Sequence, residues 1–371
     1  MKKYKVLHIT NGADVGGISN VILNYYRNID RLQFQFDFVI PPGEIGPNGK
    51  ELEKLGGTFY TLPKKSDDFQ GFIKGLRRLI KQNHYDVVHA HHHDTSYVSL
   101  FVAMSCGVKC RVAQSHSYVV EGSDLKTRIR RCVSVLLNNL SSNLRFACTE
   151  EAGNYLFGKG LKFFFPVTLL PNGIEPEKYI YSDQLRNFAR KEFKIENSTL
   201  VFGIVARISP EKNHRFLIDV LVEMKKKRKN AKLLVVGGGP LRDELIEYAS
   251  KKGVTANVIF AGRRPDLINM LCAMDVFTLP SFYEGSPVSA VEAVATGLPV
   301  VLSTTITKDL NVFKNVTYAD NKDCEEWVRD ILELSAKGRV TDAISNINKN
   351  GFNVRNITGI LRESYLRIIN S

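Results

Sequence analysis

Short apolar runs alternate with helical patterns from one end of the 371-residue chain to the other, and the whole alternation occurs twice. The runs that read as buried strands are Val6–Thr10, Phe34–Ile40, Val87–Ala90, Val112–Gln114 and Phe146–Cys148, then Leu200–Ala206, Leu233–Val236, Val258–Phe260, Val276–Leu279 and Pro299–Leu302. Helical spacing lies between them, as in Ile18–Asn28, Phe69–Gln82, Phe216–Lys226 and Leu241–Lys252. Such alternation predicts parallel sheets with helices on both faces. Because ten or more strands exceed what one core supports, we predict two similar α/β domains.

The two domains should meet near Leu169–Tyr181, where Pro, Asn and Gly accumulate as they do in turns and crossing segments. This predicts an N-terminal domain over 1–170 and a C-terminal domain over 171–355. The last segment, 356–371, carries apolar residues at helical spacing and should pack one apolar face onto a domain. Ligands of open α/β sheets bind outside the carboxyl ends of the strands, so chemistry is expected in the loops that follow strands.

The composition narrows the class of protein. Hydrophobic residues make up 44% and charged residues 24%, which excludes a collagen-like, disordered or disulfide-scaffold chain. The six cysteines form no Cys-x-x-Cys pair, which indicates reduced thiols in a cytoplasmic protein and no zinc site. No apolar stretch approaches the roughly 18–20 residues of a membrane helix, and the N-terminal run reads as a strand and not as a secretory signal.

The net charge is +13, and the excess is concentrated in the first 170 residues. That part has 22 basic and 14 acidic side chains, against 29 and 24 in the remainder. A basic surface favours an anionic partner, which could be a phosphorylated ligand, an acidic lipid or a nucleic acid.

Two loops that follow predicted strands are candidates for binding phosphate. Gly16 and Gly17 lie between the first strand and the first helix, where adjacent glycines let backbone N–H groups approach an anion. A tight turn without a ligand is the alternative, since the spacing fits neither a dinucleotide-binding motif nor a P-loop. Arg207 and Lys212 follow a later strand, and two cations facing a cleft could neutralise a diphosphate. A solvated loop is the alternative there.

The segment from Glu284 to Ala293 is the most informative loop. Ser286 is a favourable N-cap and Pro287 a favourable first residue of a helix, which then carries Glu292 in its second turn. The helix N-terminus can receive phosphate oxygens, and the two ionised carboxylates can accept hydrogen bonds from hydroxyls of a sugar and of a ribose. Two acids placed favourably near a helix start are the structural alternative.

Histidines also follow predicted strands. His116 could face a reacting centre through either ring nitrogen, although a structural role is the alternative. The run His89–Asp94 has the composition of a metal cluster. Because neighbouring residues of a strand point to opposite faces, we expect few of these rings to converge on one ion and predict no metal site. The chain also lacks Asp-x-Asp, the usual carboxylate pair for a divalent ion on a nucleotide diphosphate.

Six features in order carry a family resemblance: the Gly16-Gly17 loop, SHS at 115–117, PNGIE at 171–175, ARISPEKN at 206–213, VVGGGPL at 235–241 and EGSPVSAVEA at 284–293. Across essentially its whole length the chain resembles the retaining glycosyltransferases of family 4, which have the GT-B architecture of two facing Rossmann-like domains with an interdomain cleft. The last motif has that family's E-x7-E spacing. The chain is most similar to bacterial enzymes that build capsular or exopolysaccharide repeat units on a lipid carrier. It departs from many members at 303–309, where they have two glycines and an acid.

The resemblance implies roles for the residues that match. Gly16 and Gly17 would approach the donor phosphates or the acceptor from the first domain. His116 would lie beside the donor sugar. Arg207 and Lys212 would hold the diphosphate and stabilise the leaving group. The final helix would return to the first domain, which binds the acceptor.

On the donor side, the resemblance implies that Glu284 binds sugar hydroxyls and that Glu292 binds the ribose. Four residues would place their backbone near the sugar and phosphate: Gly285, Ser286, Pro287 and Val288. The base would lie near Gly237 and the loop of Gly262, Arg263 and Arg264.

The implied reaction is transfer of a sugar from a nucleotide sugar, a UDP-sugar by family habit, to a lipid-linked or oligosaccharide acceptor. Arg207, Lys212 and the helix dipole at 286–288 would stabilise the charge that develops on the departing diphosphate, so no metal or other cofactor is expected. Retention would follow from front-face attack, with the departing phosphate accepting the proton of the acceptor. We expect no covalent nucleophile.

Two basic segments of the first half suggest where such an enzyme works. Lys74, Arg77, Arg78 and Lys81 form one stripe on a predicted helix, and Lys126, Arg128, Arg130 and Arg131 precede the apolar run 133–140. A basic amphipathic surface can bind anionic lipid with about 1 kcal/mol per cation. We therefore expect a cytoplasmic protein, peripheral on the inner face of the cell membrane; solvated helix faces are the alternative.

Three other functions compete with this hypothesis. A nucleotide-sugar epimerase of the same fold is one, although the order of motifs fits transfer better. A nucleic-acid-binding protein fits the charge, but the basic runs lack interleaved aromatic residues and no binding module is recognised, so no nucleic-acid partner is expected. An inactive nucleotide-sugar-binding partner is opposed by the presence of Arg207, Lys212, Glu284 and Glu292.

Overall fold

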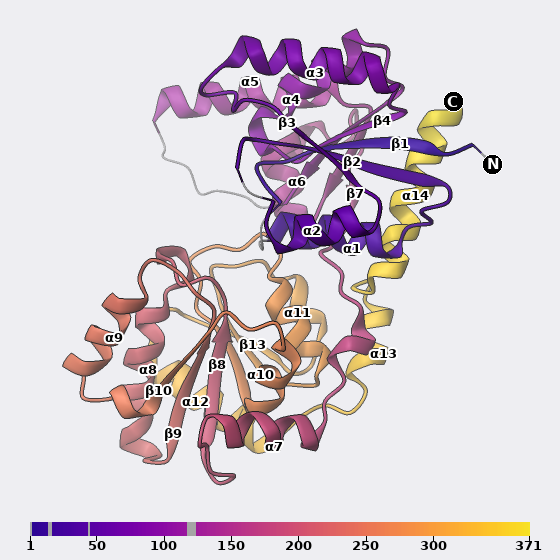
Figure 1. Ribbon diagram of the computed structural model, residues 1–371. Coiled ribbons are helices and arrows are strands. Elements are labelled where there is room, and N and C mark those ends of the chain that lie inside the picture. Colours follow the sequence, from indigo (N-terminus) through magenta and orange to yellow (C-terminus); the bar gives the residue numbers. More distant parts are fainter. Residues whose placement is uncertain (1, 14–16, 44, 117–123) are drawn as a thin grey trace. The chain divides into compact units, whose positions relative to one another are not determined.

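The structure is a computed structural model that describes residues 2–13, 17–43, 45–116 and 124–371. The chain divides into two compact units, each built from alternating strands and helices (Figure 1). The first unit contains Met1–Gly173 and Asn353–Ser371, and the second contains Ile174–Phe352. The chain therefore crosses between units three residues after the predicted start of the second domain and three residues before its predicted end.

The first unit has a seven-stranded sheet in the order β3-β2-β1-β4-β5-β6-β7, with every pair of neighbours parallel. Its strands are β1 (Tyr4–Ile9), β2 (Phe34–Ile40), β3 (Thr58–Thr61), β4 (Val87–Ala90), β5 (Cys110–Ser115), β6 (Leu144–Ala147) and β7 (Thr168–Leu169). The sequence did not predict β3 and β7. Both are short strands at the edges of the sheet, and neither has a buried residue, so they lack the apolar run that marked the others.

Helices cover both faces of this sheet. They are α1 (Gly17–Asn28), α2 (Pro47–Lys54), α3 (Phe69–Asn83), α4 (Ser96–Ser105), α5 (Leu125–Ser141), α6 (Glu150–Phe157) and α14 (Val354–Asn370), with short 3-10 turns η1 (His93–Thr95) and η2 (Lys159–Leu161). One face packs against α1 and α14, where Tyr26 stacks on Phe36 and Tyr365 lies against Phe34. The other face packs against α3 and α4. The last helix of the chain is thus part of the core of the first unit.

The second unit has a six-stranded parallel sheet in the order β10-β9-β8-β11-β12-β13. Its strands are β8 (Leu200–Val205), β9 (Ala231–Val236), β10 (Val258–Gly262), β11 (Val276–Leu279), β12 (Val300–Ser303) and β13 (Val316–Ala319). Its helices are α7 (Asp183–Glu192), α8 (His214–Lys227), α9 (Arg242–Lys251), α10 (Leu267–Ala273), α11 (Val288–Ala295), α12 (Cys324–Lys337) and α13 (Ala343–Lys349), with 3-10 turns η3 (Pro176–Tyr179), η4 (Pro210–Lys212), η5 (Thr255–Asn257) and η6 (Asp309–Val312). Only the edge strand β13 was not predicted.

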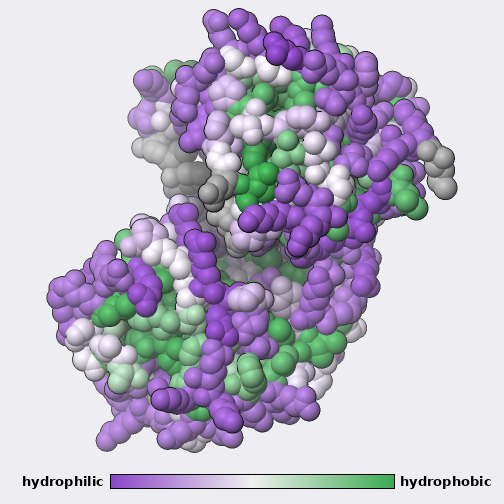
Figure 2. All heavy atoms as spheres, viewed as in Figure 1, coloured by the Kyte–Doolittle hydropathy of each residue, from purple (hydrophilic) through white to green (hydrophobic). Residues whose placement is uncertain are grey.

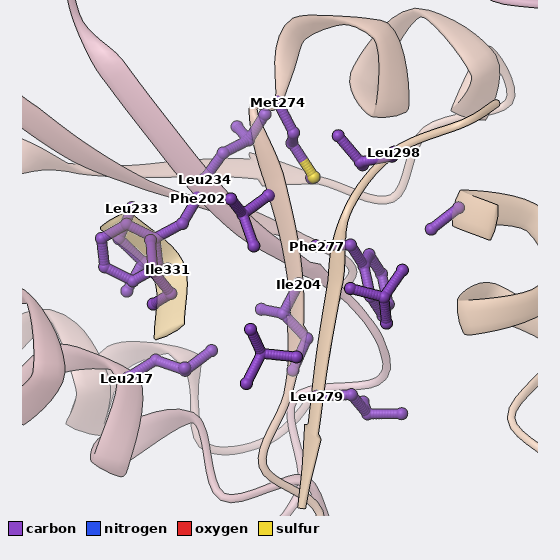
Figure 3. Packing of buried hydrophobic residues seen from close by; sticks show 14 of the residues in the cluster. Phe202, Ile204, Leu217, Leu233, Leu234, Met274, Phe277, Leu279, Leu298 and Ile331 are labelled. Atoms are coloured by element: carbon purple, nitrogen blue, oxygen red, sulfur yellow. The ribbon is translucent and has the colours of Figure 1, made fainter. Parts of the chain in front are cut away.

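One large apolar cluster forms the core of the second unit. Figure 3 shows side chains of β8, β9 and β11 packed together with Leu217 of α8 and Ile331 of α12. Because the central strands β8, β9, β11 and β12 are buried on both faces, they read as continuous apolar runs, which is why the sequence located them within a few residues.

Both sheets reverse their strand order next to their first strand. The reversal lies between β1 and β4 in the first unit and between β8 and β11 in the second. At such a switch point the loops after the two central strands diverge and leave a crevice at the carboxyl edge of the sheet. The loops after β8 and β11 are the ones that carry the predicted Arg207, Lys212 and Glu284.

Within the described ranges, no helix combines the length and the apolar character that crossing a bilayer requires. On the face shown in Figure 2, each unit presents mostly hydrophilic residues, with smaller hydrophobic patches among them.

Candidate functional site

Direct hydrogen bonds join the loops after β8 and β11 at the switch point of the second unit. The backbone N–H of Phe282 donates to the carbonyl of Glu211 at 2.9 Å, and the Asn213 amide donates to the carbonyl of Pro280 at 3.4 Å. Asn213 adopts a left-handed conformation, with φ of 53°, where η4 gives way to α8. The two loops therefore form one connected surface.

Lys212 and Glu284 meet on this surface, 72 residues apart in sequence. Lys212 Nζ lies 2.5 Å from Glu284 Oε1, and the two side chains are only 21% and 12% exposed. Ser281 Oγ donates to the same oxygen at 2.8 Å. Within the described part of the chain, Glu284 Oε2 has no hydrogen-bond donor. The pair thus presents a shielded cation beside a carboxylate oxygen that can still accept hydrogen bonds.

Arg207 is held more loosely than Lys212. Its side chain is 67% exposed, and its guanidinium lies 3.7 Å from Glu211, whose carboxylate also contacts Ser209 Oγ at 2.5 Å. An exposed ion pair of this length contributes little to stability, so the guanidinium can turn toward an anion at small cost. The sequence did not single out Glu211, which lies close to both predicted cations.

The glycine loop after β9 packs backbone to backbone against the loop after β8. A Cβ at Gly237 would lie 1.9 Å from the carbonyl oxygen of Ala206, and Gly237 has a φ of +141°. A Cβ at Gly239 would lie 2.1 Å from the carbonyl oxygen of Ile208. Glycine is therefore required at both positions by close approach, and the loop is fixed beside the β8 loop.

The two predicted arginines of the loop after β10 differ in their surroundings. Arg263 is exposed and lies across Gly238, next to the glycine loop. The Arg264 guanidinium is bound by the carboxylates of Glu192 and Asp266 through contacts of 2.7–3.0 Å. Arg264 thus holds the loop to α7, and only Arg263 remains exposed toward a ligand.

Helix α11 begins one residue later than predicted. Its N-cap is Pro287, with no hydrogen bond from the capping side chain, and Val288 is the first helical residue. The prediction of Ser286 as N-cap and Pro287 as first helical residue is wrong, because the extended ψ of 93° at Pro287 keeps this residue outside the helix. Gly285 and Pro287 are buried, and Glu284 lies in the loop before the helix as expected.

Glu292 lies in the second turn of α11, as predicted. Its Oε1 accepts a hydrogen bond of 2.6 Å from the Tyr179 hydroxyl of η3. Burial raises the pKa of Glu292 to about 7, although the Tyr179 hydrogen bond opposes this shift by favouring the ionised form. The charge of this carboxyl group therefore changes near neutral pH.

The loop at 303–309 is tied to the β11 loop. Thr305 Oγ1 donates to the carbonyl of Ser281 at 2.9 Å and lies 2.7 Å from Ser303 Oγ. Because Ser281 also holds Glu284, this loop supports the position of the carboxylate.

In the first unit, only part of the predicted glycine loop can be located. Gly17 is exposed at the start of α1 and has open space around its Cβ position, whereas Gly16 lies outside the described residues. A cavity of about 410 Å³ lies at the carboxyl edge of the sheet near this loop. Its lining includes Asn11, Lys64, Lys65, Phe72 and His92.

Lys65 is the most constrained cation of this cavity. Its ammonium donates to the side-chain oxygen and the carbonyl of Thr95 at 2.8 and 3.3 Å. Burial lowers the pKa of Lys65 to about 8, so its charge is sensitive to what else fills the cavity.

His116 is buried at the end of β5 and belongs to a chain of histidines that the sequence did not predict. His91 Nδ1 lies 2.8 Å from His116 Nε2, and His91 Nε2 lies 3.0 Å from His8 Nδ1. His89 stacks on His91 and contacts the Tyr365 hydroxyl of α14 through Nδ1 at 2.7 Å. His116 Nδ1 and His8 Nε2, the two ends of the chain, have no partner within the described ranges.

The tautomers of the three hydrogen-bonded histidines, His8, His91 and His116, depend on one another. A neutral imidazole has one N–H donor and one acceptor nitrogen. If His8 donates to His91, then His91 must donate to His116, and His116 Nδ1 carries the remaining proton. In the reverse arrangement, His116 Nδ1 is an acceptor. The character of the His116 nitrogen that is left for a ligand is thus set together with that of His8.

Two of the four histidines in the run His89–Asp94 lie in one cluster, and the third member, His8, comes from outside the run. His89 and His91 are two residues apart and so share a face of β4, and His8 joins them from the neighbouring strand β1. Their ring nitrogens lie within 4.8 Å of one another, close enough to be considered for a metal ion. Both nitrogens of His91 and Nδ1 of His89 already have hydrogen-bond partners, namely His8, His116 and Tyr365, which an ion bound at those atoms would have to displace. Absence of a metal stays a prediction.

Comparisons with known proteins identify the families that the two halves of the chain match. Residues 15–178 match the family described as Glycosyltransferase Family 4, and residues 186–351 match the family described as Glycosyl transferases group 1. The chain is 31% identical over 344 residues to a Bacillus subtilis protein named as a glycosyltransferase, EpsF, covering 90% of this chain and 88% of that protein.

Two further proteins match nearly the whole chain. An Escherichia coli UDP-Gal:alpha-D-GlcNAc-diphosphoundecaprenol alpha-1,3-galactosyltransferase is 25% identical, covering 99% of this chain and 98% of that protein. The crystal structure of Anabaena Alr3699/HepE with UDP and glucose superimposes with a TM-score of 0.81 at 18% identity, covering 98% of this chain and 100% of that one.

Proposed function

We propose that this chain, which belongs to glycosyltransferase family 4, transfers a sugar from a UDP-sugar donor to a saccharide carried on a lipid diphosphate. That it is a glycosyltransferase with the GT-B fold follows from its two Rossmann-like units, its family matches and its relatives. The single observation that carries the proposed reaction is the Lys212–Glu284 pair at the switch point of the second unit.

UDP as the nucleotide is supported by the relatives. The E. coli enzyme is named for a UDP-galactose donor, and the Anabaena structure holds UDP and glucose. For this chain, the proposal assigns the base to Arg263 and the glycine loop at Gly237, which is fixed by close backbone packing, and the ribose to Glu292.

We propose that transfer needs no metal and retains the anomeric configuration. When the sugar–phosphate bond breaks, negative charge develops on the diphosphate. Lys212 is fixed by Glu284, which Ser281 holds in turn, and Lys212 therefore needs little reorganisation to meet this charge; Arg207 can turn toward it. Glu284 Oε2 would accept hydrogen bonds from hydroxyls of the sugar. Front-face attack, in which the departing phosphate takes the proton of the acceptor, requires no protein nucleophile.

The acceptor would bind in the first unit. Supporting this, the cavity beside β1 and β4 combines an apolar wall with Lys64 and Lys65, a combination suited to a sugar diphosphate on a lipid. The E. coli relative is named for an acceptor of that kind. Because such an acceptor is anchored in a bilayer, we propose that the enzyme works at the inner face of the cell membrane as a peripheral protein in capsule or exopolysaccharide synthesis.

Glu292→Gln is expected to change how donor binding depends on pH. With a pKa of about 7, the native carboxyl is increasingly protonated as the pH falls from 8 to 6 and loses its purely accepting character toward ribose hydroxyls. The donor KM of the native enzyme should therefore rise several-fold over this interval, with a smaller change in kcat. In the Gln variant the KM should be uniformly higher and independent of pH. Identical pH dependence of KM in both proteins would remove Glu292 from the donor site.

A donor panel tests the proposed function as a whole. The purified chain is incubated with UDP-, GDP- and dTDP-sugars, with and without polyprenyl-diphosphate-linked GlcNAc, and release of the nucleotide diphosphate is measured with EDTA present. We expect one UDP-sugar to be consumed, faster with the acceptor, and a glycosylated lipid to appear. Conversion of the donor to its epimer without release of nucleotide would instead establish the epimerase alternative.

A further inference from the structure

Helix α5 of the first unit exposes its apolar side chains to solvent and buries polar ones. Five large apolar side chains are at least half exposed: Leu125 (72%), Ile129 (56%), Val133 (50%), Leu136 (51%) and Leu140 (53%). The residues that the helix buries are instead polar: Ser134, Asn138, Asn139 and Ser141. A surface helix of a globular protein normally shows the opposite distribution.

Hydrogen bonds fix the helix in this orientation. Ser134 Oγ and Asn138 Nδ2 both donate to the carbonyl of Asp94 in η1, at 2.7 and 3.1 Å. Asn139 Nδ2 donates to the carbonyl of Phe157 at the end of α6 at 2.9 Å. Each of these amides and hydroxyls is specific in direction, so the helix cannot rotate to bury its apolar side without leaving buried polar groups unpaired. The exposed stripe is thus a consequence of the fold.

The apolar residues form one continuous stripe. Their spacing of four, four, three and four residues keeps them on one side of the helix along all 17 residues of α5. Single exposed apolar residues are ordinary, whereas a contiguous row of five marks a surface that another apolar phase covers.

Positive charge borders the stripe. Lys126, Arg128 and Arg130 are exposed on the same helix, and α5 contains no acidic residue. Arg131 is also exposed and lies over the ring of Tyr155. Apolar side chains flanked only by cations match a surface that is anionic outside and apolar beneath, which describes a bilayer that contains acidic lipid.

Helix α3 provides an internal comparison. It carries the other basic stripe, with Lys74, Arg77, Arg78 and Lys81 exposed. Its apolar residues Phe72, Leu76, Leu79 and Ile80 are buried in the core, and a single large apolar side chain of the helix, Phe69 at its first position, is more than half exposed. Both helices pack on α4. Only α5 combines charge with an unburied apolar face.

We propose that α5 docks on an anionic membrane by inserting its apolar stripe at the boundary between headgroups and acyl chains, with Lys126, Arg128 and Arg130 contacting acidic headgroups. This inference rests on the proposed function to the extent that a lipid-linked acceptor gives docking a purpose. The docking itself depends only on the surface of α5.

The test uses the full-length protein and vesicles of phosphatidylcholine with 30% phosphatidylglycerol, in 150 mM salt. The double variant Leu136→Ser/Leu140→Ser should bind about a hundredfold more weakly by co-sedimentation, since each leucine that is kept from the apolar phase weakens binding about tenfold. The matched control is Phe188→Ser, which removes a 61% exposed apolar side chain from α7 of the second unit and should leave binding unchanged.

A second pair of variants separates the two basic stripes. Lys126→Gln/Arg128→Gln on α5 should weaken binding to the anionic vesicles about thirtyfold, at about fivefold per cation, and should have little effect on the weak binding to pure phosphatidylcholine. Lys74→Gln/Arg77→Gln on α3 removes the same charge and should weaken binding to the anionic vesicles less than threefold.

Unchanged binding in the leucine variant, or an equal loss in the α3 variant, would overturn the proposal. So would sedimentation velocity showing that native protein forms a dimer that the leucine variant cannot form, because the stripe would then face a second copy. The thermal midpoint of each variant verifies folding. Transfer to a short-chain, detergent-free acceptor should stay within twofold of native in all variants, and its absence from the native protein would count against the proposed function while leaving the vesicle result valid.

Discussion

Replacing Lys212 by Ala should lower kcat for sugar transfer at least a hundredfold, and Glu284→Ala should do the same. In the proposed reaction, Lys212 stabilises negative charge that develops on the diphosphate as the sugar–phosphate bond breaks, and removal of one such preorganised group typically costs about 10²–10³ in rate. Glu284 holds the lysine ammonium at 2.5 Å and offers its second oxygen to the sugar, so its loss affects both orientation and binding. Initial rates of UDP release with donor and acceptor at saturation measure the effect.

The pair could instead serve only the fold, and a double replacement distinguishes the two roles. Each single variant leaves a largely shielded charge without its partner, at a cost of about 1–3 kcal/mol in stability. If the pair were only structural, Lys212→Met/Glu284→Gln would recover both stability and activity, since neither charge is then unpaired. We expect it to recover stability alone. Lys226→Ala, which breaks an exposed ion pair with Glu223 on α8, is the matched control and should keep full activity.

Acidification should unfold the first unit well before the second. Burial lowers the pKa values of His8, His92 and His116 to about 3, and those of His89 and His91 also lie well below the usual 6.5. The second unit has one such residue, His214, with a pKa of about 4. Because the first unit has more buried histidines with lowered pKa values, we expect acid to destabilise it more than the second unit.

The direction in which pH changes the free energy of unfolding follows from which state of the protein binds protons. Between pH 6.5 and about 3 the unfolded chain binds protons at these imidazoles and the folded chain does not, so the free energy of unfolding decreases as the pH falls through this window. Each histidine contributes about 1.4 kcal/mol per pH unit, so the three with pKa values near 3 alone remove about 4 kcal/mol per unit. Between pH 6 and 5 this is a large fraction of the stability of a domain.

Two measurements at pH 7, 6 and 5 test this prediction. Urea denaturation gives the free energy of unfolding, and hydrogen exchange reports the protection of each unit separately. We expect amides of β1, β4 and β5 to lose protection at pH 5 while those of β8 and β11 keep it. His8→Gln should reduce the slope of the free energy of unfolding against pH. Equal loss of protection in both units at pH 5 would contradict this account.

The fold could be predicted from the sequence largely because its central strands are buried on both faces. Such strands appear as apolar runs that can be recognised without knowing which strands lie beside them. For this reason β2, β4 and β11 were located to the residue. The edge strands β3, β7 and β13 have partly exposed residues, and their pairing depends on the strand beside them, so no local pattern marked them. The fourth edge strand, β10, is also only partly buried, but its apolar run at 258–260 was enough to predict it.

The site was predictable in its loops but not in its contacts. Motif and position at the switch point indicated Lys212 and Glu284 as candidates, but their direct contact depends on how two loops 72 residues apart are folded against each other. The same limit explains Arg264, which was predicted near the base and is bound to Glu192 and Asp266. The histidine chain was missed because its residues come from β1, β4 and the end of β5. The sequence of a single strand does not show which other strands lie beside it.

The return of α14 to the first unit bears on how the protein is made. Val354, Ile357, Leu361 and Tyr365 complete the apolar layer over β1 and β2, and Tyr365 contacts His89. During synthesis, the first 173 residues leave the ribosome without this layer and stay incomplete until the residues of α14 emerge. The second unit is contiguous in sequence and has no such delay. The unit that begins to emerge first is therefore the second one to be completed.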